Sequence, residues 1–177
     1  CICYVNIFVE KIEEAPKTVR DMSFSLGPRI NAAGRVGHAL TAAKLLMAND
    51  EGSALELASQ LETMNQARRD IDEDLTEEAI ALMAEQPPGR SCTIVHGEGW
   101  HRGVLGIVAS RLVEQRYCPT IVLSEENEVL TGSARSVPGI DIHEAFEKCR
   151  HLIEQFGGHP MAAGLTIRKE NMDAFTI

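Results

Sequence analysis

A long stretch of regularly spaced, mostly apolar residues ends at Pro87-Pro88-Gly89 and predicts a single long helix. These positions, apolar except for Arg68, recur at steps of three and four residues, which is one face of an α-helix: Leu57, Leu61, Met64, Arg68, Ile71, Leu75, Ala79 and Leu82. Ser53 and Glu56 have the spacing of a capping box at its start, and proline ends it. Roughly 33 helical residues span about 50 Å. We expect a connector between two lobes, with an ordinary long surface helix as the alternative.

The acidity of the chain is concentrated in this same segment. The formal net charge is -9, and residues 49–85 carry eleven acidic side chains against Arg68 and Arg69. The rest of the chain therefore balances to zero and is able to form local basic pockets. A negative net charge disfavours a nucleic-acid partner, but this distribution does not exclude one.

Composition and cysteine usage indicate a globular protein of the cytoplasm. Hydrophobic residues make up 44% and charged residues 24% of the chain, and no apolar run approaches the roughly 20 residues of a membrane span. Five cysteines without a Cys-x-x-Cys spacing predict free thiols in a reducing compartment rather than a disulfide framework. Because the chain starts at Cys1 rather than Met, we expect it to be a piece of a longer protein.

Beyond residue 90 the pattern changes to alternating strands and helices. We expect strands at 92–95, 119–123, 129–135 and 161–167, and helices at 104–115, from Asp141 to about Gln155, and from Asn171. Before the long helix, residues 39–47 predict a short helix. This order favours an α/β fold with a mixed sheet, preceded by a long connector helix.

The most informative motif is a glycine-rich stretch with one histidine: Phe156, Gly157, Gly158, His159, Pro160, Met161, Ala162, Ala163 and Gly164. Two glycines allow a bend whose backbone comes close to a ligand, and consecutive amides in such a bend can bind an anion. A tight helix-to-strand turn with a structural histidine explains the same residues equally well.

A second motif follows at a strand end, where Ser133, Arg135 and Ser136 lie close together in sequence. Two hydroxyls beside an arginine suit phosphate, because the planar guanidinium donates two parallel hydrogen bonds. A surface strand end with one solvated arginine is the alternative.

Two further segments carry weaker signals. Residues 96–104, which include His101 and Gly103, join a strand to a helix start, where amides and the helix dipole attract anions; ordinary polar loop residues would look the same. Residues 27–35, which include Arg29 and Arg35, are typical of a loop leading into a helix.

Metal-dependent hydrolysis of phosphodiesters requires several Asp and His residues that converge on paired cations. Asp141 and His143 form the one Asp-x-His pair in the chain, and a helix cap explains Asp141 better. We therefore predict no catalytic metal site within this chain.

Taken together, the motifs resemble those of a known superfamily. Residues 157–164 are similar to the Gly-Gly-His signature of the DHH-associated domain, which follows the catalytic DHH domain in a phosphoesterase superfamily. Three other segments resemble the RecJ family of exonucleases: residues 26–35, the pair Asn65 and Arg68, and residues 101–112. The resemblance runs from about Leu26 to the end, while residues 1–25 match nothing.

The resemblance implies a single-stranded-DNA exonuclease that cuts from the 5′ end with Mn²⁺ or Mg²⁺ and acts in repair and recombination. Residues 1–48 would be the tail of its catalytic domain, 49–89 the connector helix, and 90–177 the nucleic-acid-binding associated domain. It implies that phosphate is held by Ser133, Arg135 and Ser136, with Gly157, Gly158 and His159 in the same pocket. Arg29 would grip the DNA backbone, and His101 and Gly103 would shape the pocket rim.

The chain departs from the family because the Asp-His-His motif is absent. We therefore expect a portion that binds single-stranded DNA without cutting it, with the catalytic domain of the same polypeptide as its partner and no membrane contact. The alternatives are a phosphoesterase of small nucleotides or oligonucleotides from the same superfamily, or a non-catalytic binding subunit.

Overall fold

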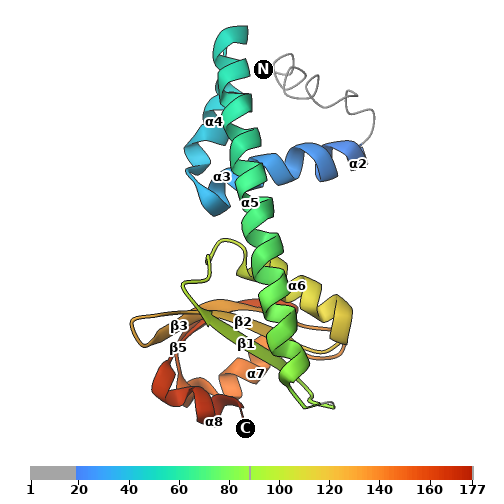
Figure 1. The fold of residues 1–177 in the computed structure, drawn as a ribbon, viewed down its shortest axis with the longest axis vertical. Helices are drawn as coiled ribbons and strands as arrows, with labels where there is room; N and C mark the ends of the chain where they lie inside the picture. The colour runs from blue at the N-terminus through green and yellow to red at the C-terminus, as the bar shows by residue number, and fades with distance from the viewer. Residues whose placement is uncertain (1–18, 88, 177) are drawn as a thin grey trace. The chain divides into compact units, whose positions relative to one another are not determined.

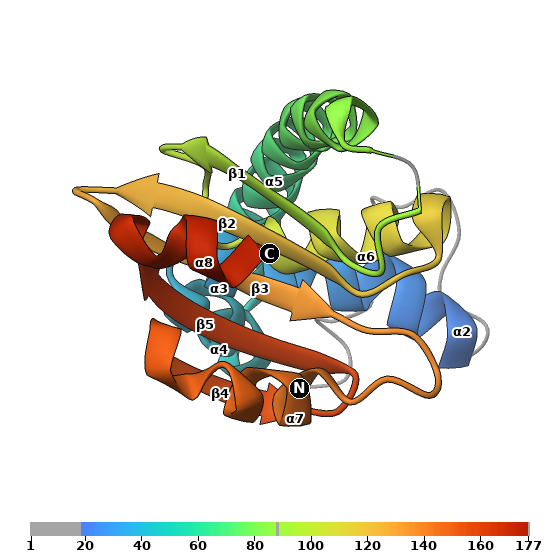
Figure 2. The same ribbon diagram turned by 90° about the horizontal axis from the view of Figure 1, so that it is seen from below.

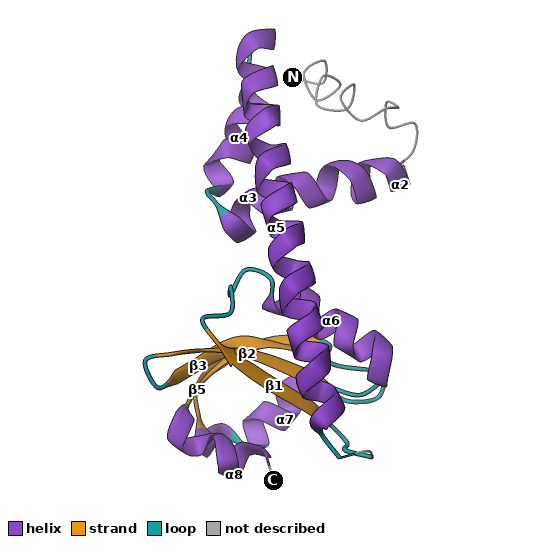
Figure 3. Ribbon diagram, in the orientation of Figure 1, coloured by secondary structure: helices purple, strands orange, loops and turns teal. Residues whose placement is uncertain are grey.

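The computed structural model describes residues 19–87 and 89–176 (Figure 1). They fall into two compact units, whose boundary in the sequence lies between Asp70 and Ile71. The first unit is helical, and the second combines a sheet with helices (Figure 3). Helix α5 (Glu51–Glu85) runs through this boundary, so each unit contains one part of it.

The helices of the first unit pack around small side chains. Its elements are α2 (Val19–Asp21), the π-helix η1 (Met22–Leu26), α3 (Gly27–Val36), α4 (Ala39–Met47) and the first part of α5. Its core consists of alanines and leucines: Leu26, Ala33, Ala42, Leu45, Ala54, Ala58 and Leu61. Because alanine side chains are short, the helix backbones come close to one another. The predicted helix at 39–47 is confirmed.

Residues 27–35 are helical, so the prediction of a loop was wrong. Pro28 lies in the first turn of α3, which follows the π-helix η1 directly. Leu26, which precedes α3, has helical dihedral angles of φ -77° and ψ -45°, so the chain passes directly from η1 into α3. The Gly-Pro pair therefore lies within a continuous helical segment, where the π-helix changes to an α-helix.

The long helix is confirmed, but its start was predicted at the wrong residue. Helix α5 has 35 residues, and the carboxylate of Asp50 accepts a hydrogen bond from the backbone N–H of Ser53 at 2.8 Å. This hydrogen bond lowers the pKa of Asp50 below its ordinary value, which favours the charged form beside the helix dipole. Asp50, rather than Ser53, is the residue that satisfies the start of the helix.

The second unit contains a five-stranded mixed sheet with the strand order β1-β2-β3-β5-β4. Strands β1 and β2 are parallel, and the other neighbouring pairs are antiparallel, which confirms the expected α/β fold. The elements are β1 (Thr93–Glu98), α6 (Leu105–Arg116), β2 (Thr120–Glu126), β3 (Val129–Arg135), α7 (Ile142–Lys148), η2 (Arg150–Leu152), β4 (Ile153–His159), β5 (Ala162–Arg168), η3 (Lys169–Asn171) and α8 (Met172–Thr176).

The two faces of this sheet are covered by different helices. Figure 2 shows α7 and α8 on the near face, where the sheet contributes a row of apolar side chains to the core: Ile121, Leu123, Leu130, Ala134, Ala163, Leu165 and Ile167. On the other face, α6 and the second part of α5 pack over Val95 and Val122. Successive residues of a strand point to opposite faces, so each strand serves both layers.

The helix expected from Asp141 to about Gln155 is much shorter than predicted. Asp141 does cap α7, because its Oδ1 accepts the N–H of Glu144 at 2.9 Å, but α7 ends at Lys148 and β4 follows. A β-bulge between Ile153 and Gln155 shifts the alternation of β4, so that Ile153 and Phe156 both face the core. This spacing of three residues imitates a helix. The glycine pair therefore lies in a strand, not in the bend that we expected.

Candidate functional site

The candidate site lies on the face of the sheet opposite α7 and α8. Helix α6 packs against β2 and β3 on this face. Two rows of paired residues then cross from β3 through β5 to β4. Arg135 pairs with Ala162, which pairs with His159, and Ser133 pairs with Gly164, which pairs with Gly157. Directly paired residues point to the same face, and two strand spacings amount to about 10 Å.

Arg135 and Ser133 lie against the first turn of α6. A Cβ atom placed on Gly106 would come 2.5 Å from Nη2 of Arg135 and 3.5 Å from Oγ of Ser133. Nη1 of Arg135 donates to the backbone oxygen of Ala134 at 2.8 Å, which fixes one side of the guanidinium. A helix start attracts negative charge, and arginine binds phosphate bidentately. The arrangement therefore suits an oxyanion such as a phosphate group.

The two predicted glycines have different structural reasons. Gly158 has φ +152°, and a Cβ atom there would come 2.4 Å from the backbone oxygen of Ala162, so the strand packing itself demands glycine. At Gly157 a Cβ atom would meet nothing within 4 Å. Gly157 therefore leaves open space on the face that carries Ser133, whereas Gly158 allows β4 to pair closely with β5.

A shallow groove of about 330 Å³ continues this open face away from Arg135. Its lining combines glycines, neutral polar side chains and two apolar residues: Thr131, Gly132, Gln155, Phe156, Gly157, Gly164, Leu165 and Thr166. The hydroxyls of Thr131 and Thr166 lie 3.3 Å apart across β3 and β5. The groove thus offers hydrogen-bonding groups without charge beside a site that carries a guanidinium.

His159 is exposed at the end of β4, and Ser136 helps to fix the turn that follows it. The backbone N–H of Ser136 donates to the oxygen of Met161 at 2.9 Å, and its buried hydroxyl donates to the oxygen of Ile140 at 2.7 Å. In this conformation Ser136 stabilises the turn instead of presenting its hydroxyl beside Ser133. A direct contact between Ser136 and phosphate stays a prediction.

His101 and Gly103 lie in the loop that leads into α6. The N–H of Gly103 donates to Nδ1 of His101 at 3.1 Å, so the side chain of His101 is held against the turn. His101 is exposed, and its backbone oxygen accepts the N–H of Val104 at 3.1 Å. The two residues thus shape the chain immediately before the helix start, and a place at the pocket rim stays a prediction.

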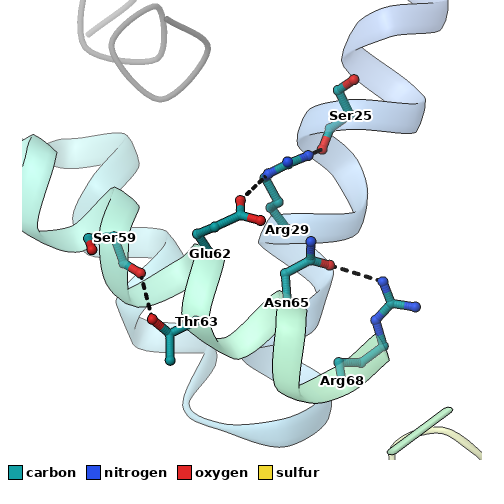
Figure 4. Close-up of polar contacts among 7 residues, drawn as sticks. All are labelled: Ser25, Arg29, Ser59, Glu62, Thr63, Asn65 and Arg68. Carbon is teal, nitrogen blue, oxygen red and sulfur yellow. Dashed lines mark hydrogen bonds and ion pairs between the residues drawn. The ribbon is translucent and has the colours of Figure 1, made fainter. Parts of the chain in front are cut away.

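Arg29 belongs to the first unit, where it forms an ion pair with Glu62 and donates to the backbone oxygen of Ser25 at 2.8 Å (Figure 4). Its side chain is 14% exposed. Nearby on α5, Nη2 of Arg68 donates to Oδ1 of the fully buried Asn65 at 3.0 Å (Figure 4). A backbone-gripping role for Arg29 stays a prediction, and in this conformation its guanidinium is engaged by α5.

The sequence predictions did not include Gly106 among the site residues. Its signal is a glycine in the first turn of a helix, where alanine is more favourable by roughly 0.5–1 kcal/mol and close contact with another group gives a reason for glycine. They also did not include the hydroxyls of Thr131 and Thr166, because the pairing of β3 with β5 brings together residues that are far apart in the sequence.

The described residues do not fit a Mn²⁺ or Mg²⁺ centre. Among residues 19–87 and 89–176, no three His, Cys, Asp or Glu side chains gather closely enough to hold a metal ion. Asp141 is engaged as the cap of α7. In the same part of the chain, no helix is both long and apolar enough to cross a membrane.

Comparison with known proteins identifies the family. The family model of the DHHA1 domain matches residues 89–176. The single-stranded-DNA-specific exonuclease RecJ of Bacillus subtilis is 42% identical over 153 residues, which are 85% of this chain and 20% of that protein. RecJ of Thermus thermophilus, solved with Mg²⁺, has a TM-score of 0.86 and 28% identity, covering 97% of this chain and 27% of that one.

The match to the structure of the same Thermus protein with Mn²⁺ has an equal TM-score of 0.86 and covers 25% of the Thermus chain. The chain spans between 20% and 31% of the length of the curated relatives it matches. The family resemblance predicted from the motifs is thus confirmed. Residues 89–176 match the DHHA1 domain, and over most of its length this chain is related to one part of RecJ proteins, which are single-stranded-DNA-specific exonucleases.

Proposed function

We propose that this chain is the single-stranded-DNA-binding portion of a RecJ-type 5′–3′ exonuclease. The observation that carries the proposal is the convergence of Arg135 and Ser133 on the first turn of α6. His159 and Gly157 lie in the same two rows of the sheet. The site thus combines a cation, a hydroxyl and a helix start at one edge of an open face.

In this proposal the 5′ phosphate binds to the guanidinium of Arg135 and the hydroxyl of Ser133. His159 donates a further hydrogen bond from the neighbouring edge strand, and Gly157 leaves room for the sugar. The neutral groove lined by Thr131, Gln155 and Thr166 receives the rest of the nucleotide. Phosphate contacts carry no base information, so we expect binding at any sequence, weakened by salt.

In a longer protein, different segments of this chain would have different roles. Residues 1–48 belong to the end of the catalytic DHH domain, 49–89 form the connector, and 90–177 hold DNA. The related Thermus structures contain Mg²⁺ or Mn²⁺, and we assign that metal to the catalytic domain of the same polypeptide. The chain by itself then binds DNA without cutting it. By analogy with the family, the whole protein acts in DNA repair and recombination in the cytoplasm.

Fluorescence-anisotropy titration with 5′-phosphorylated and unphosphorylated single strands, at two salt concentrations, tests the proposal. We expect tighter binding of the phosphorylated strand and loss of that preference in Arg135→Ala. A hydrogen bond to a charged group contributes about 1.5–3 kcal/mol, which corresponds to roughly 10- to 100-fold in affinity. The loss should be the same for strands of different base composition.

Arg150→Ala is the matched control, because Arg150 is an exposed arginine in η2 that pairs with Glu147 and stacks on Phe156. It removes the same charge from the side of the sheet that carries α7. If Arg135→Ala and Arg150→Ala lowered the affinity for the phosphorylated strand equally, net charge would explain the effect, and the proposed site would be contradicted. Tight binding of dinucleotides, with no gain for longer strands, would indicate a small-nucleotide phosphoesterase instead.

A further inference from the structure

The indole of Trp100 connects the loop before α6 to helix α5. Trp100 is 7% exposed, and its Nε1–H donates to Oε2 of Glu78 at 3.0 Å. Its ring belongs to the core formed by α5, α6 and the sheet. Buried tryptophans usually find a partner for the ring N–H, and here that partner comes from a surface carboxylate of the long helix.

The end of strand β1 is shaped to accommodate this ring. A Cβ atom on Gly97 would come 2.2 Å from Cε2 of Trp100, so any side chain at that position would displace the indole. Gly99 has φ +67°, a backbone conformation that other residues adopt only with strain. Gly97 therefore leaves room for the indole, and Gly99 turns the chain so that Trp100 enters the core.

Hydrogen bonds transmit the position of Trp100 to the start of α6. The backbone oxygen of His101 accepts the N–H of Val104 at 3.1 Å, and the oxygen of Val104 accepts the N–H of Ile107 at 2.8 Å and of Val108 at 3.1 Å. Val104 is fully buried. The turn that follows Trp100 is thus continuous with the first turn of the helix.

The first turn of α6 in turn supports Arg135. Gly106 lies so close to the guanidinium that an added Cβ would come 2.5 Å from Nη2. A small displacement of this turn would therefore move the surface against which Arg135 rests. Further along α6, Nη2 of Arg111 donates to Oδ2 of the buried Asp72 on α5 at 2.7 Å, which holds the same two helices together at a second point.

We propose that Trp100, through its hydrogen bond to Glu78, is a positioning residue for Arg135. The indole fixes the first turn of α6 relative to α5, and Gly106 in that turn sets the place of the guanidinium. This inference rests on the proposed function, since the phosphate preference of Arg135 is the property that positioning should improve.

The test compares Glu78→Ala, Glu78→Gln and Glu77→Ala. Glu78→Ala removes the acceptor without disturbing the helix, because Glu78 is exposed and alanine favours helix. Glu78→Gln keeps an acceptor oxygen. Glu77→Ala is the matched control, because Glu77 is the exposed neighbour on the same helix and loses the same charge. Trp100 is the one tryptophan of the chain, so its fluorescence reports on the hydrogen bond directly.

We expect Glu78→Ala to lower the ratio of affinities for phosphorylated and unphosphorylated strands about three- to tenfold, the range of one net hydrogen bond. Its tryptophan emission should shift to longer wavelength. Glu78→Gln and Glu77→Ala should leave both the ratio of affinities and the wavelength of the tryptophan emission unchanged. A lower melting temperature in Glu78→Ala with an unchanged ratio would show a merely structural role and overturn the inference.

A double-mutant cycle with Gly106→Ala tests whether Trp100 acts on Arg135 through Gly106. The added methyl displaces the guanidinium of Arg135 directly. In a chain that already carries Gly106→Ala, Glu78→Ala should therefore cause little further decrease in the ratio of affinities. Additive losses would overturn the connection through Gly106. The failure of the proposed function gives a different result, because the unmodified chain would then show no preference for phosphorylated strands.

Discussion

The two faces of strands β3, β5 and β4 differ in what they contribute to this protein. The face toward α7 and α8 is closed, and Leu130, Leu165 and Ile167 on it are almost completely buried. The opposite face carries Ser133, Arg135 and Gly157, none of which is fully buried. Adjacent residues of one strand therefore belong to a core and to a candidate binding site, and the pleat of the strand separates the two.

The difference between the two faces accounts for the polar residues and glycines of the candidate site, because the stability of the sheet does not depend on them. The closed face supplies the apolar burial that stabilises the sheet, at roughly 25 cal/mol per Å². The open face is thereby free to present a guanidinium, hydroxyls and bare glycine backbone. Substitutions on the closed face should thus affect stability, and substitutions on the open face should affect binding.

The largest effect is expected for Leu130→Ala on the closed face. Leu130 is fully buried, and truncation of a buried leucine costs about 2–5 kcal/mol. Thr131→Ala, one residue later on the open face, removes a hydroxyl that contacts Thr166 and should cost less than about 1 kcal/mol. Urea denaturation of both variants measures the difference, and similar losses at the two positions would contradict the division between the faces.

A smaller contrast is expected between the two neighbouring glycines of β4. Gly158→Ala forces an unfavourable φ and a contact with the backbone oxygen of Ala162, and such strain costs about 1–3 kcal/mol. Gly157→Ala enters open space and should change the free energy of unfolding by less than about 1 kcal/mol, while weakening strand binding by narrowing the groove. Thermal unfolding and anisotropy separate the two effects, and the reverse order of stabilities would be inconsistent with the observed strand pairing.

The smallest effect concerns Cys92, whose side chain packs against the core of the closed face. Burial raises the pKa of its thiol to about 12. The thiol therefore stays neutral at pH 8 and should react slowly with thiol reagents in the folded chain. Since the thiol of the unfolded chain ionises near its ordinary pKa of about 8.5, this group destabilises the fold only as the pH rises from there toward 12. Peptide mapping after labelling in buffer and in guanidinium measures the rates, and equal rates would show that this side of the sheet admits solvent.

The pattern of the sequence predicted the elements whose periodicity was undisturbed. Helix α5 and strand β3 follow three-to-four and two-residue spacings, because each buries one regular face. Asp141 was recognisable as a cap, since a side-chain oxygen three residues before an amide is a local arrangement. The motifs around Arg135 and His159 were also visible in the sequence, although their chemistry was assigned through the family resemblance.

Features that depend on pairing between distant segments could not be predicted from the local sequence. The β-bulge of β4 gave Ile153 and Phe156 a helical spacing, and their contacts with β5 determine that they form a strand. The close approach of Gly106 to Arg135 joins two segments that are nearly thirty residues apart, and no local pattern records it. Neighbouring side chains in the sequence were sufficient to predict most of the regular elements and the residue types of the candidate site. The register of β3, β5 and β4 decided which of those residues share a face, because that depends on hydrogen bonds between strands that the local sequence does not specify.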